Sequence, residues 1–182
     1  MSEIVVRNKT IDDIDACVRL GSVVQRSAYR DIFPPETFDK RDADMHTRIQ
    51  QRKADRLNGT NEWGSNSAMV EYVAVSDGKV VGYVRGLVES TCQRYRDKKY
   101  AEVKAIFVDQ EYQKLGVGKK LFDEIANKFK EKGCKRMVIG VLKENLSAHK
   151  IYPKWGCKLD DYQDEFQMMG YRVPQVYYIY DL

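Results

Sequence analysis

The chain has 182 residues, of which 43% are hydrophobic and 32% are charged. These values are typical of one globular domain with its own core, so we expect a single domain over residues 1–182 and exclude wholesale disorder. The formal net charge of +4 is too mild to indicate a nucleic-acid partner, and no apolar run reaches the roughly 18 residues of a membrane span.

The first part of the chain predicts a strand followed by helices. Residues 4–7 are typical of a short strand. Thr10, with Asp13 three residues later, forms an approximate capping box. The apolar stripe of residues 11–20 then predicts one helix, and residues 23–29 predict a second.

The next segment is the least regular part of the chain. Pro34-Pro35 should end the preceding helix, because the residue before a proline disfavours helical geometry. Residues 36–57 are polar and weakly helical, and 58–60 and 64–67 are rich in turn-forming residues. We expect this region to hold a substrate-facing insert, since loops on a rigid scaffold carry function.

The middle of the chain predicts paired strands. Residues 72–75 and 80–84 flank Asp77-Gly78, a dipeptide that favours an antiparallel hairpin. Residues 101–108 form the next apolar strand.

A strand, helix and strand follow one another from residue 101 to 142. The helix spans about 116–132, with apolar residues on one face, and Gly133 ends it. Residues 137–142 are a second apolar strand. A helical crossover between two strands predicts a parallel pair.

The remaining residues complete the sheet. We expect a short helix at 145–154 and two strands, 158–167 and 173–180, joined around Gly170. Antiparallel strands on both sides of a parallel βαβ unit predict a mixed, open α/β sheet.

The cysteine spacing and the N-terminus argue against a metal-binding, disulfide-bonded or secreted protein. Cys17, Cys92, Cys134 and Cys157 show no CxxC spacing, so we expect no metal site and no disulfide framework. Met1 to Ile4 lack the basic and apolar parts of a signal segment, so the cytoplasm is the expected compartment.

The turn between the strand 101–108 and the following helix predicts a phosphate site. Glycines and free backbone N–H groups at a helix N-terminus favour an anion. A Walker loop fits poorly, because Gln113 replaces its first glycine and Lys120 its hydroxyl residue. A dinucleotide fingerprint also fails, because Leu121 replaces its third glycine.

The third pattern, Gln/Arg-x-x-Gly-x-Gly/Ala, is met in full by Gln113, Gly116 and Gly118. Here the chain resembles the GNAT acetyltransferase superfamily over residues 72–157. A second segment of that family, Asn-x-x-Ala-x-x-x-Tyr-x-x-x-Gly, is matched at Asn145, Ala148, Tyr152 and Gly156. The resemblance implies a mostly antiparallel twisted sheet whose central parallel strands splay around acetyl-CoA.

The resemblance also implies which residues bind acetyl-CoA, the expected co-substrate. The pyrophosphate would lie on the turn, and a lysine there (Lys114, Lys119 or Lys120) pairs with phosphate or serves only solubility. The pantetheine arm would pair with the strand backbone, which would also supply an N–H to the thioester carbonyl. The implied contacts are Ile106, Phe107, Val108, Gln113, Lys114, Leu115, Gly116, Val117, Gly118, Lys119 and Asn145.

The same resemblance implies an acid, and the chemistry requires a base. Tyr152 matches the family's general acid, the alternative being a packed helix tyrosine. A protonated alkyl amine must lose a proton before it attacks, and Glu102 is our candidate base, with Glu71 and Glu89 as rivals. Asn145 could equally cap the helix that carries Tyr152.

The acceptor is less defined. By the same resemblance, Tyr29, Phe33 and the 36–70 segment should line its side of the site. The acidic Asp31, Glu36 and Glu71 would suit a cationic acceptor. A small amine or polyamine is therefore favoured over a protein N-terminus or an aminoglycoside. The apolar tail 176–180 is either core or the interface of a homodimer. The alternatives to an enzyme are a non-catalytic CoA-binding sensor or interaction domain and a nucleotide-binding protein.

Overall fold

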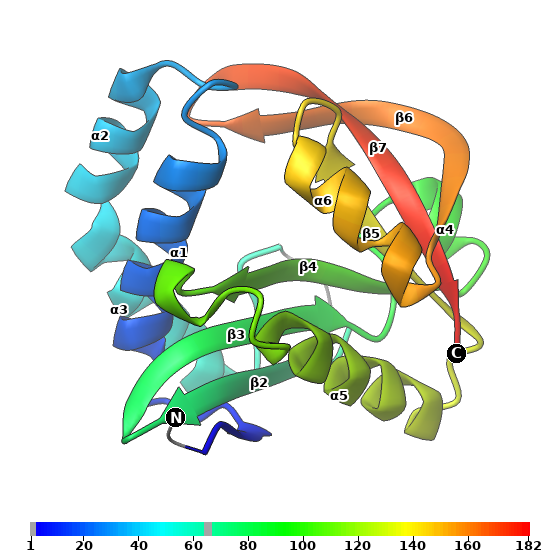
Figure 1. Cartoon of the computed structure of the whole chain (residues 1–182), viewed down its shortest axis with the longest axis horizontal. Coiled ribbons are helices and arrows are strands. Elements are labelled where there is room, and N and C mark those ends of the chain that lie inside the picture. The colour runs from blue at the N-terminus through cyan, green and yellow to red at the C-terminus, as the bar shows by residue number, and fades with distance from the viewer. Residues whose placement is uncertain (1–2, 64–66) are drawn as a thin grey trace.

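The computed structural model describes residues 3–63 and 67–182, and they form one layered arrangement around a twisted sheet (Figure 1). The sheet has seven strands in the order β1-β2-β3-β4-β5-β7-β6. Only β4 and β5 run parallel, and every other neighbouring pair is antiparallel. The strands are β1 (Val5–Asn8), β2 (Met69–Ser76), β3 (Lys79–Leu87), β4 (Ala101–Val108), β5 (Arg136–Leu142), β6 (Lys158–Met168) and β7 (Tyr171–Asp181).

Helices cover both faces of the sheet. The helices are α1 (Ile14–Ala28), α2 (Pro35–Ala43), α3 (Met45–Asn58), α4 (Gln93–Arg96), α5 (Val117–Glu131) and α6 (Leu146–Ile151), with 3₁₀ turns η1 (Gln110–Tyr112) and η2 (Pro153–Trp155). Helix α5 packs on β2, β3 and β4, whereas α1 packs on β3 and β4 from the opposite face and also contacts α2 and α3. No helix in the described residues is long and apolar enough to cross a membrane.

The main core lies under α5. Leu121, Phe122, Ile125 and Phe129 are fully buried there, as their spacing on one helix face predicts. They pack against inward side chains of β2, β3, β4 and β5, together with residues of α6 and η2. The predicted βαβ unit is thus confirmed, and so is the mixed, mostly antiparallel sheet.

The N-terminal helical region differs from the prediction. One continuous helix, α1, replaces the two expected at 11–20 and 23–29. Thr10 does not cap it. Instead the Oδ2 atom of Asp13 accepts hydrogen bonds from the backbone N–H and the hydroxyl of Thr10, and helix α1 begins after Asp13.

Residues 36–57 are more ordered than expected. They form two helices, α2 and α3, which meet at Asp44. The expected turn at 58–60 reduces to Gly59, which ends α3 with a φ of 67°. Of the expected loop 64–67, residues 64–66 lie outside the described residues.

Strands β4 and β5 separate after three residue pairs. Ala101, Glu102 and Val103 pair with Met137, Val138 and Ile139. Beyond this point β4 continues paired only with β3, and β5 continues paired only with β7. One backbone edge of each strand is therefore left open where the two diverge, as the splayed sheet predicts.

Candidate functional site

The glycine-bearing turn leads from the open half of β4 into α5. Lys114 and Gly116 both have left-handed backbones, with φ values of 62° and 82°. Gly116 is the N-cap of α5, and its carbonyl accepts the N–H of Lys120 at 3.0 Å. The N–H groups of residues 117–119 precede that first helical bond, so they are free to bind an anion. The Gln113 side chain fixes the turn by donating from Nε2 to the carbonyl of Val108 at 3.1 Å.

The three lysines of the turn are not equivalent. Lys119 forms an ion pair with Asp123, with Nζ 2.7 Å from Oδ2. Lys114 and Lys120 are exposed, and the ion pairs of the described residues include neither of them. Lys114 and Lys120 are therefore better placed than Lys119 to meet a phosphate.

Gly118 brings this turn into contact with Trp155. A Cβ atom at Gly118 would lie 3.3 Å from the Trp155 ring, closer than most Cβ contacts. The same ring packs on Phe122, with centroids 5.0 Å apart, and on Tyr152 at 5.6 Å. The second glycine of the motif thus allows one aromatic ring to connect the glycine-bearing turn to Tyr152.

Tyr152 lies at the C-terminal end of α6. Asn145 caps this helix, because its Oδ1 accepts the N–H of Ala148 at 3.2 Å. The predicted N-cap is therefore confirmed. The contact of Asn145 with a coenzyme stays a prediction. Burial raises the pKa of the Tyr152 phenol, and the nearby phenol of Tyr29 raises it further. Tyr152 is therefore protonated at neutral pH and retains a proton to donate.

Tyr29 and Phe33 lie between helix α2 and the hairpin of β6 and β7. Tyr29 follows the last residue of α1, and burial raises its pKa to about 12. Phe33 packs on Phe38 of α2 and Phe166 of β6. Tyr29 acts electrostatically on Tyr152, whose pKa it raises, while Phe33 is buried in a hydrophobic cluster with Phe38 and Leu142.

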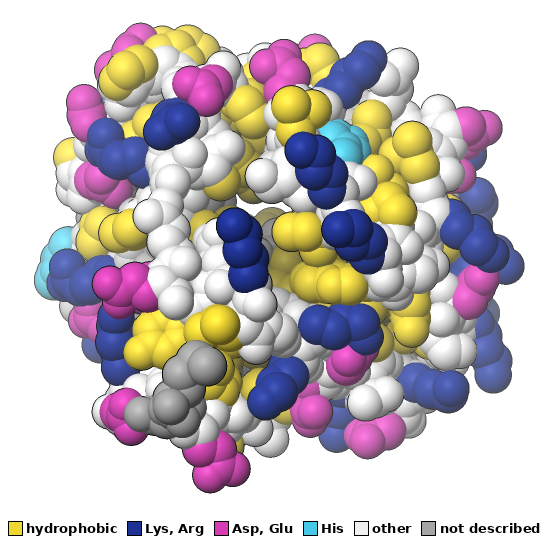
Figure 2. Space-filling model, viewed as in Figure 1, with side chains coloured by type: hydrophobic (Ala, Val, Ile, Leu, Met, Phe, Trp, Pro, Cys, Tyr) yellow, Lys and Arg dark blue, Asp and Glu magenta, His cyan; other side chains and the backbone are white. Residues whose placement is uncertain are grey.

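The open edges of β4 and β5 face a hollow. Figure 2 shows the centre of this face hollowed between the regions of β4 and α6, with hydrophobic side chains inside and lysines or arginines around it. Ile106, Phe107 and Val108 lie on the open half of β4 and are each partly buried. Their main-chain groups on the β5 side have no strand partner among the described residues, so an extended ligand could pair there.

Glu102, the candidate base, lies in the paired half of β4 and is buried. Its Oε2 atom accepts the hydroxyl of Ser90 and both the N–H and the hydroxyl of Thr91, within 3.0 Å. Its Oε1 atom lies 2.9 Å from Nζ of Lys104. Both oxygens are thus engaged, so any proton transfer to Glu102 requires a water or a rearrangement of these contacts.

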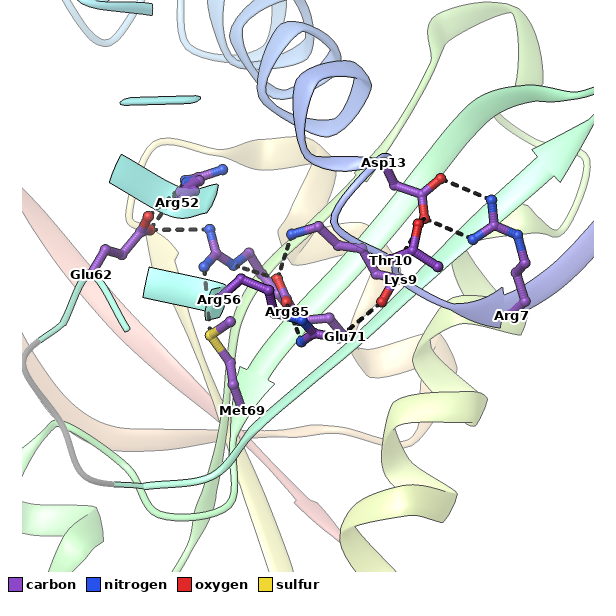
Figure 3. A network of polar contacts seen from close by, with 10 residues as sticks. All are labelled: Arg7, Lys9, Thr10, Asp13, Arg52, Arg56, Glu62, Met69, Glu71 and Arg85. Atoms are coloured by element: carbon purple, nitrogen blue, oxygen red, sulfur yellow. Dashed lines mark hydrogen bonds and ion pairs between the residues drawn. The ribbon is translucent and has the colours of Figure 1, made fainter. Parts of the chain in front are cut away.

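The acidic alternatives are differently placed. Glu71 is buried among cations, with Oε1 2.7 Å from Nζ of Lys9 (Figure 3). Glu89 is exposed. Asp31 and Glu36 are also exposed, and Glu36 accepts the Tyr171 hydroxyl at 2.9 Å. A buried carboxylate neutralised by cations offers nothing to an incoming polyamine, so the expected role of Glu71 is not supported by its surroundings.

Three further residues near the site were not predicted. Trp155 lies against the turn, Arg41 of α2 acts on the pKa of Tyr29, and Arg48 of α3 donates to the main-chain oxygen of Arg41. A signal for Trp155 was present, because it falls between the matched Tyr152 and Gly156. No local pattern marked the arginines, whose significance depends on which carboxylates the fold places beside them.

Comparison with known proteins gives the family. The family model "Acetyltransferase (GNAT) family" matches residues 27–157, well over half of the chain. No curated protein sequence matches significantly.

Many solved structures share the fold. The PaiA N-acetyltransferase of Thermoplasma acidophilum in complex with coenzyme A aligns with a TM-score of 0.73 and 15% identity, covering 99% of both chains. The ribosomal-protein-alanine N-acetyltransferase of Brucella melitensis gives 0.68 and 17%, covering 98% of this chain and 99% of the other. YncA of Salmonella typhimurium, solved with acetyl-CoA, gives 0.66 and 16%, covering 98% and 93%. At these identities the likeness concerns the fold.

Proposed function

The chain belongs to the acetyltransferase (GNAT) family of acyl-CoA-dependent N-acetyltransferases, and from this premise we propose that it moves an acetyl group from acetyl-CoA to a small primary amine by direct attack. The observation that carries the proposal is the sheet opening: β4 and β5 part beside the glycine-bearing turn, and Tyr152 packs on the Trp155 ring that lies against Gly118 of this turn. Residues 1–182 act as one domain in this proposal.

Acetyl-CoA would be the co-substrate, as in the coenzyme-bound structural relatives. Its pyrophosphate would bind the free N–H groups at the start of α5, with Lys114 and Lys120 nearby, and its pantetheine arm would pair with the open edge of β4. An N–H of residues 106–108 would then stabilise the developing negative charge on the thioester oxygen. Asn145 would contact the coenzyme from the cap of α6.

Tyr152 would protonate the departing thiolate. Its raised pKa keeps the phenol neutral, and its hydroxyl makes no hydrogen bond with a described residue, so the proton is not committed elsewhere. General acid catalysis of this kind contributes about 10²–10⁴-fold to the rate.

Glu102 would accept the proton of the amine through a water. An alkyl amine with a pKa of about 10.4 needs on the order of 4–5 kcal/mol to lose its proton at pH 7. The hydrogen bonds from Ser90, Thr91 and Lys104 fix the carboxylate, so a bound water would connect it to the acceptor.

The test measures thiol release with purified protein, acetyl-CoA and a panel of amines, using Tyr152→Phe as the diagnostic variant. The ring contacts remain in this variant, so we expect kcat to fall about 100-fold or more while coenzyme affinity is kept. Tyr72→Phe is the matched control, because Tyr72 is a buried tyrosine of β2 in the same core. Tight coenzyme binding with no thiol release for any amine would instead support a non-catalytic CoA-binding domain.

A further inference from the structure

Two arginines on the acceptor side of the opening have no carboxylate partner. Arg41 lies on α2 and Arg48 on α3, and Nη1 of Arg48 donates to the main-chain oxygen of Arg41 at 3.2 Å. No carboxylate of the described residues lies within 4.0 Å of either guanidinium. Asp42, the acidic neighbour of Arg41 in sequence, is 2.7 Å from Arg26 instead.

The nearby carboxylates are already neutralised. Glu62 lies between Arg52 at 2.7 Å and Arg85 at 3.1 Å (Figure 3). Glu71 lies among Lys9, Arg85 and Arg56. Asp55 accepts from Gln51 and Thr60 through one oxygen, and its other oxygen is buried without a partner. The three carboxylates, Glu62, Glu71 and Asp55, are fewer than the cations beside them, which are Lys9, Arg52, Arg56 and Arg85. None of the three therefore forms an ion pair with Arg41 or Arg48.

Burial disfavours the charged forms of both Arg41 and Arg48. Burial, followed by the charges of Arg41 and Arg52, lowers the pKa of Arg48 to about 10. Burial also lowers the pKa of Arg41, with Arg52 adding to the effect and Tyr83, Glu62 and Asp42 opposing it. At neutral pH both guanidinium groups remain charged, so the fold keeps two partly buried cations close together without a counterion.

Unpartnered polar atoms occur on the same helices. Among the described residues, Nε of Arg41 and Oγ1 of Thr37 on α2, and Oγ of Ser22 and Oε1 of Gln25 on α1, are buried with no hydrogen-bond partner. The Thr37, Ser22 and Gln25 side chains belong to residues less than a tenth exposed. Leaving such a group unpaired is unfavourable, and native proteins keep few of them.

These groups lie beside the reacting end of the opening. The Arg41 guanidinium lowers the pKa of the Tyr29 phenol, against the larger effect of burial, and Tyr29 in turn affects Tyr152. Phe38 of α2 and Tyr29 also belong to one hydrophobic cluster with Leu142 at the end of β5, so α2, which carries Arg41, borders the open end of that strand. A polyamine would bring further positive charge to this place, whereas an anionic group would supply the missing counterion.

We infer that the acceptor is an amine that also carries an anionic group, as an amino acid does, and that Arg41 and Arg48 bind this group. The inference rests on the proposed acetyl transfer and names its substrate class. Guanidinium groups suit carboxylates because their N–H donors match both oxygens. The amine would then point to the thioester while the carboxylate stays on α2 and α3.

The experiment compares amino acids with the amines that remain when the carboxylate is removed: methionine with 3-(methylthio)propylamine, and leucine with 3-methylbutylamine. For each, kcat/KM is referred to the concentration of unprotonated amine, which removes the difference in amine pKa. A charged hydrogen bond of about 1.5–3 kcal/mol corresponds to an expected preference of about 10–100-fold for the amino acid. Arg41→Gln and Arg48→Gln should each reduce this ratio about tenfold or more, chiefly through KM, and Arg41→Lys should restore part of it.

Arg19→Gln is the matched control, because it removes one arginine charge from an exposed pair on α1 and should keep the wild-type ratio. Calorimetric binding of methionine to the coenzyme-A-loaded protein gives a readout that does not need turnover. Arg41-dependent methionine binding without acetylation of any amine would overturn the proposed function, and with it the acceptor role, while still showing that the arginines bind the carboxylate.

Three results would overturn the inference while leaving acetyl transfer intact: a ratio near one, a preference for the amine without a carboxylate, or an equal loss for both members in the arginine variants. The first two mean that the carboxylate is not bound. A loss of coenzyme affinity in Arg41→Gln would also overturn it, because the arginines would then hold the coenzyme's own phosphates. Absence of both acetylation and methionine binding would overturn both proposals.

Discussion

Replacing Glu71 with glutamine tests the buried charge network of Figure 3. The Glu71 carboxylate lies 2.7 Å from Lys9, 3.4 Å from Arg56 and 3.5 Å from Arg85. The Glu71 and Lys9 side chains are only 3% and 4% exposed. Glutamine keeps the shape of the side chain and removes its charge, so Lys9 is left as a buried cation beside a neutral amide.

We expect the free energy of unfolding to fall by about 3–5 kcal/mol at pH 7, the usual cost of removing one partner of a buried ion pair. The free energy needed to deprotonate Lys9 sets an independent upper limit on this loss of stability. Lys9 can escape the penalty by losing its proton, which from an ordinary pKa of 10.5 costs about 5 kcal/mol at pH 7. For a chain of this length the melting temperature should fall by about 6–20 °C.

The pH dependence gives a sharper signature. Burial already lowers the pKa of Lys9, and Glu71 opposes that shift. Without Glu71 the pKa of folded Lys9 falls further, so folded Lys9 loses its proton at a lower pH than unfolded Lys9, and the unfolded chain binds more protons in that range. Stability of the variant should therefore rise relative to wild type by up to about 1.4 kcal/mol per pH unit between pH 7 and 9.

Urea unfolding at pH 7, 8 and 9 measures these differences. Asp15→Asn is the control, because Asp15 belongs to an exposed pair with Arg19 and should cost about 0.5 kcal/mol or less. The double variant Lys9→Met, Glu71→Gln should regain at least about 1 kcal/mol over Glu71→Gln, since the stranded cation is gone. A Glu71→Gln protein within 1 kcal/mol of wild type, with no change across the pH range, would refute the reasoning.

Three smaller changes test other parts of the molecule. Gly116→Ala should destabilise the protein by about 1 kcal/mol, because Gly116 has a φ of 82°, and should weaken coenzyme binding; an unchanged dissociation constant would argue against the turn as the phosphate site. Asn145→Ala should cost about 1 kcal/mol in urea unfolding through loss of the α6 cap, and an unchanged stability would contradict the cap. Asp13, whose pKa is lowered to about 2 chiefly by its hydrogen bonds from Arg7, should contribute at most about 2 kcal/mol, present above pH 4 and lost as the pH falls from about 4 to 2. Asp13→Asn should remove that acid-dependent loss, and a wild-type pH profile in the variant would exclude the role.

The parts of the fold that the sequence predicted are local ones. The turn at residues 113–118, the helix behind it and the strands on either side are specified by neighbours a few residues apart. The family model confirms the resemblance that this turn suggested. Asp77-Gly78 likewise specified its hairpin, and the strands beside it pair as expected.

Longer-range packing decided the elements that were missed. The two helices expected at 11–20 and 23–29 are one continuous helix, α1, and Gly21 within it leaves room for the Tyr83 hydroxyl, which lies where a side chain at position 21 would begin. A residue 62 positions away thus sets the local requirement for glycine, and no helix propensity contains that information.

The candidate site divides in the same way. The glycine-bearing turn was predictable from the motif, whereas the charge on the helical side depends on partners far apart in the chain. Glu71 suggested an acidic pocket, but its cations come from β3, from the end of α3 and from the residue after β1. The tertiary structure alone determines which carboxylates form ion pairs and which arginines have no carboxylate partner.

The two tryptophans of the chain lie in different surroundings. The Trp155 ring packs against Gly118 of the glycine-bearing turn, while the Arg85 guanidinium lies over the Trp63 ring at 4.4 Å. Replacing either with phenylalanine leaves a single indole fluorophore, which under the proposed function would report the coenzyme side in one protein and the acceptor side in the other. The order in which the two substrates arrive could then be followed by stopped-flow fluorescence without an added dye.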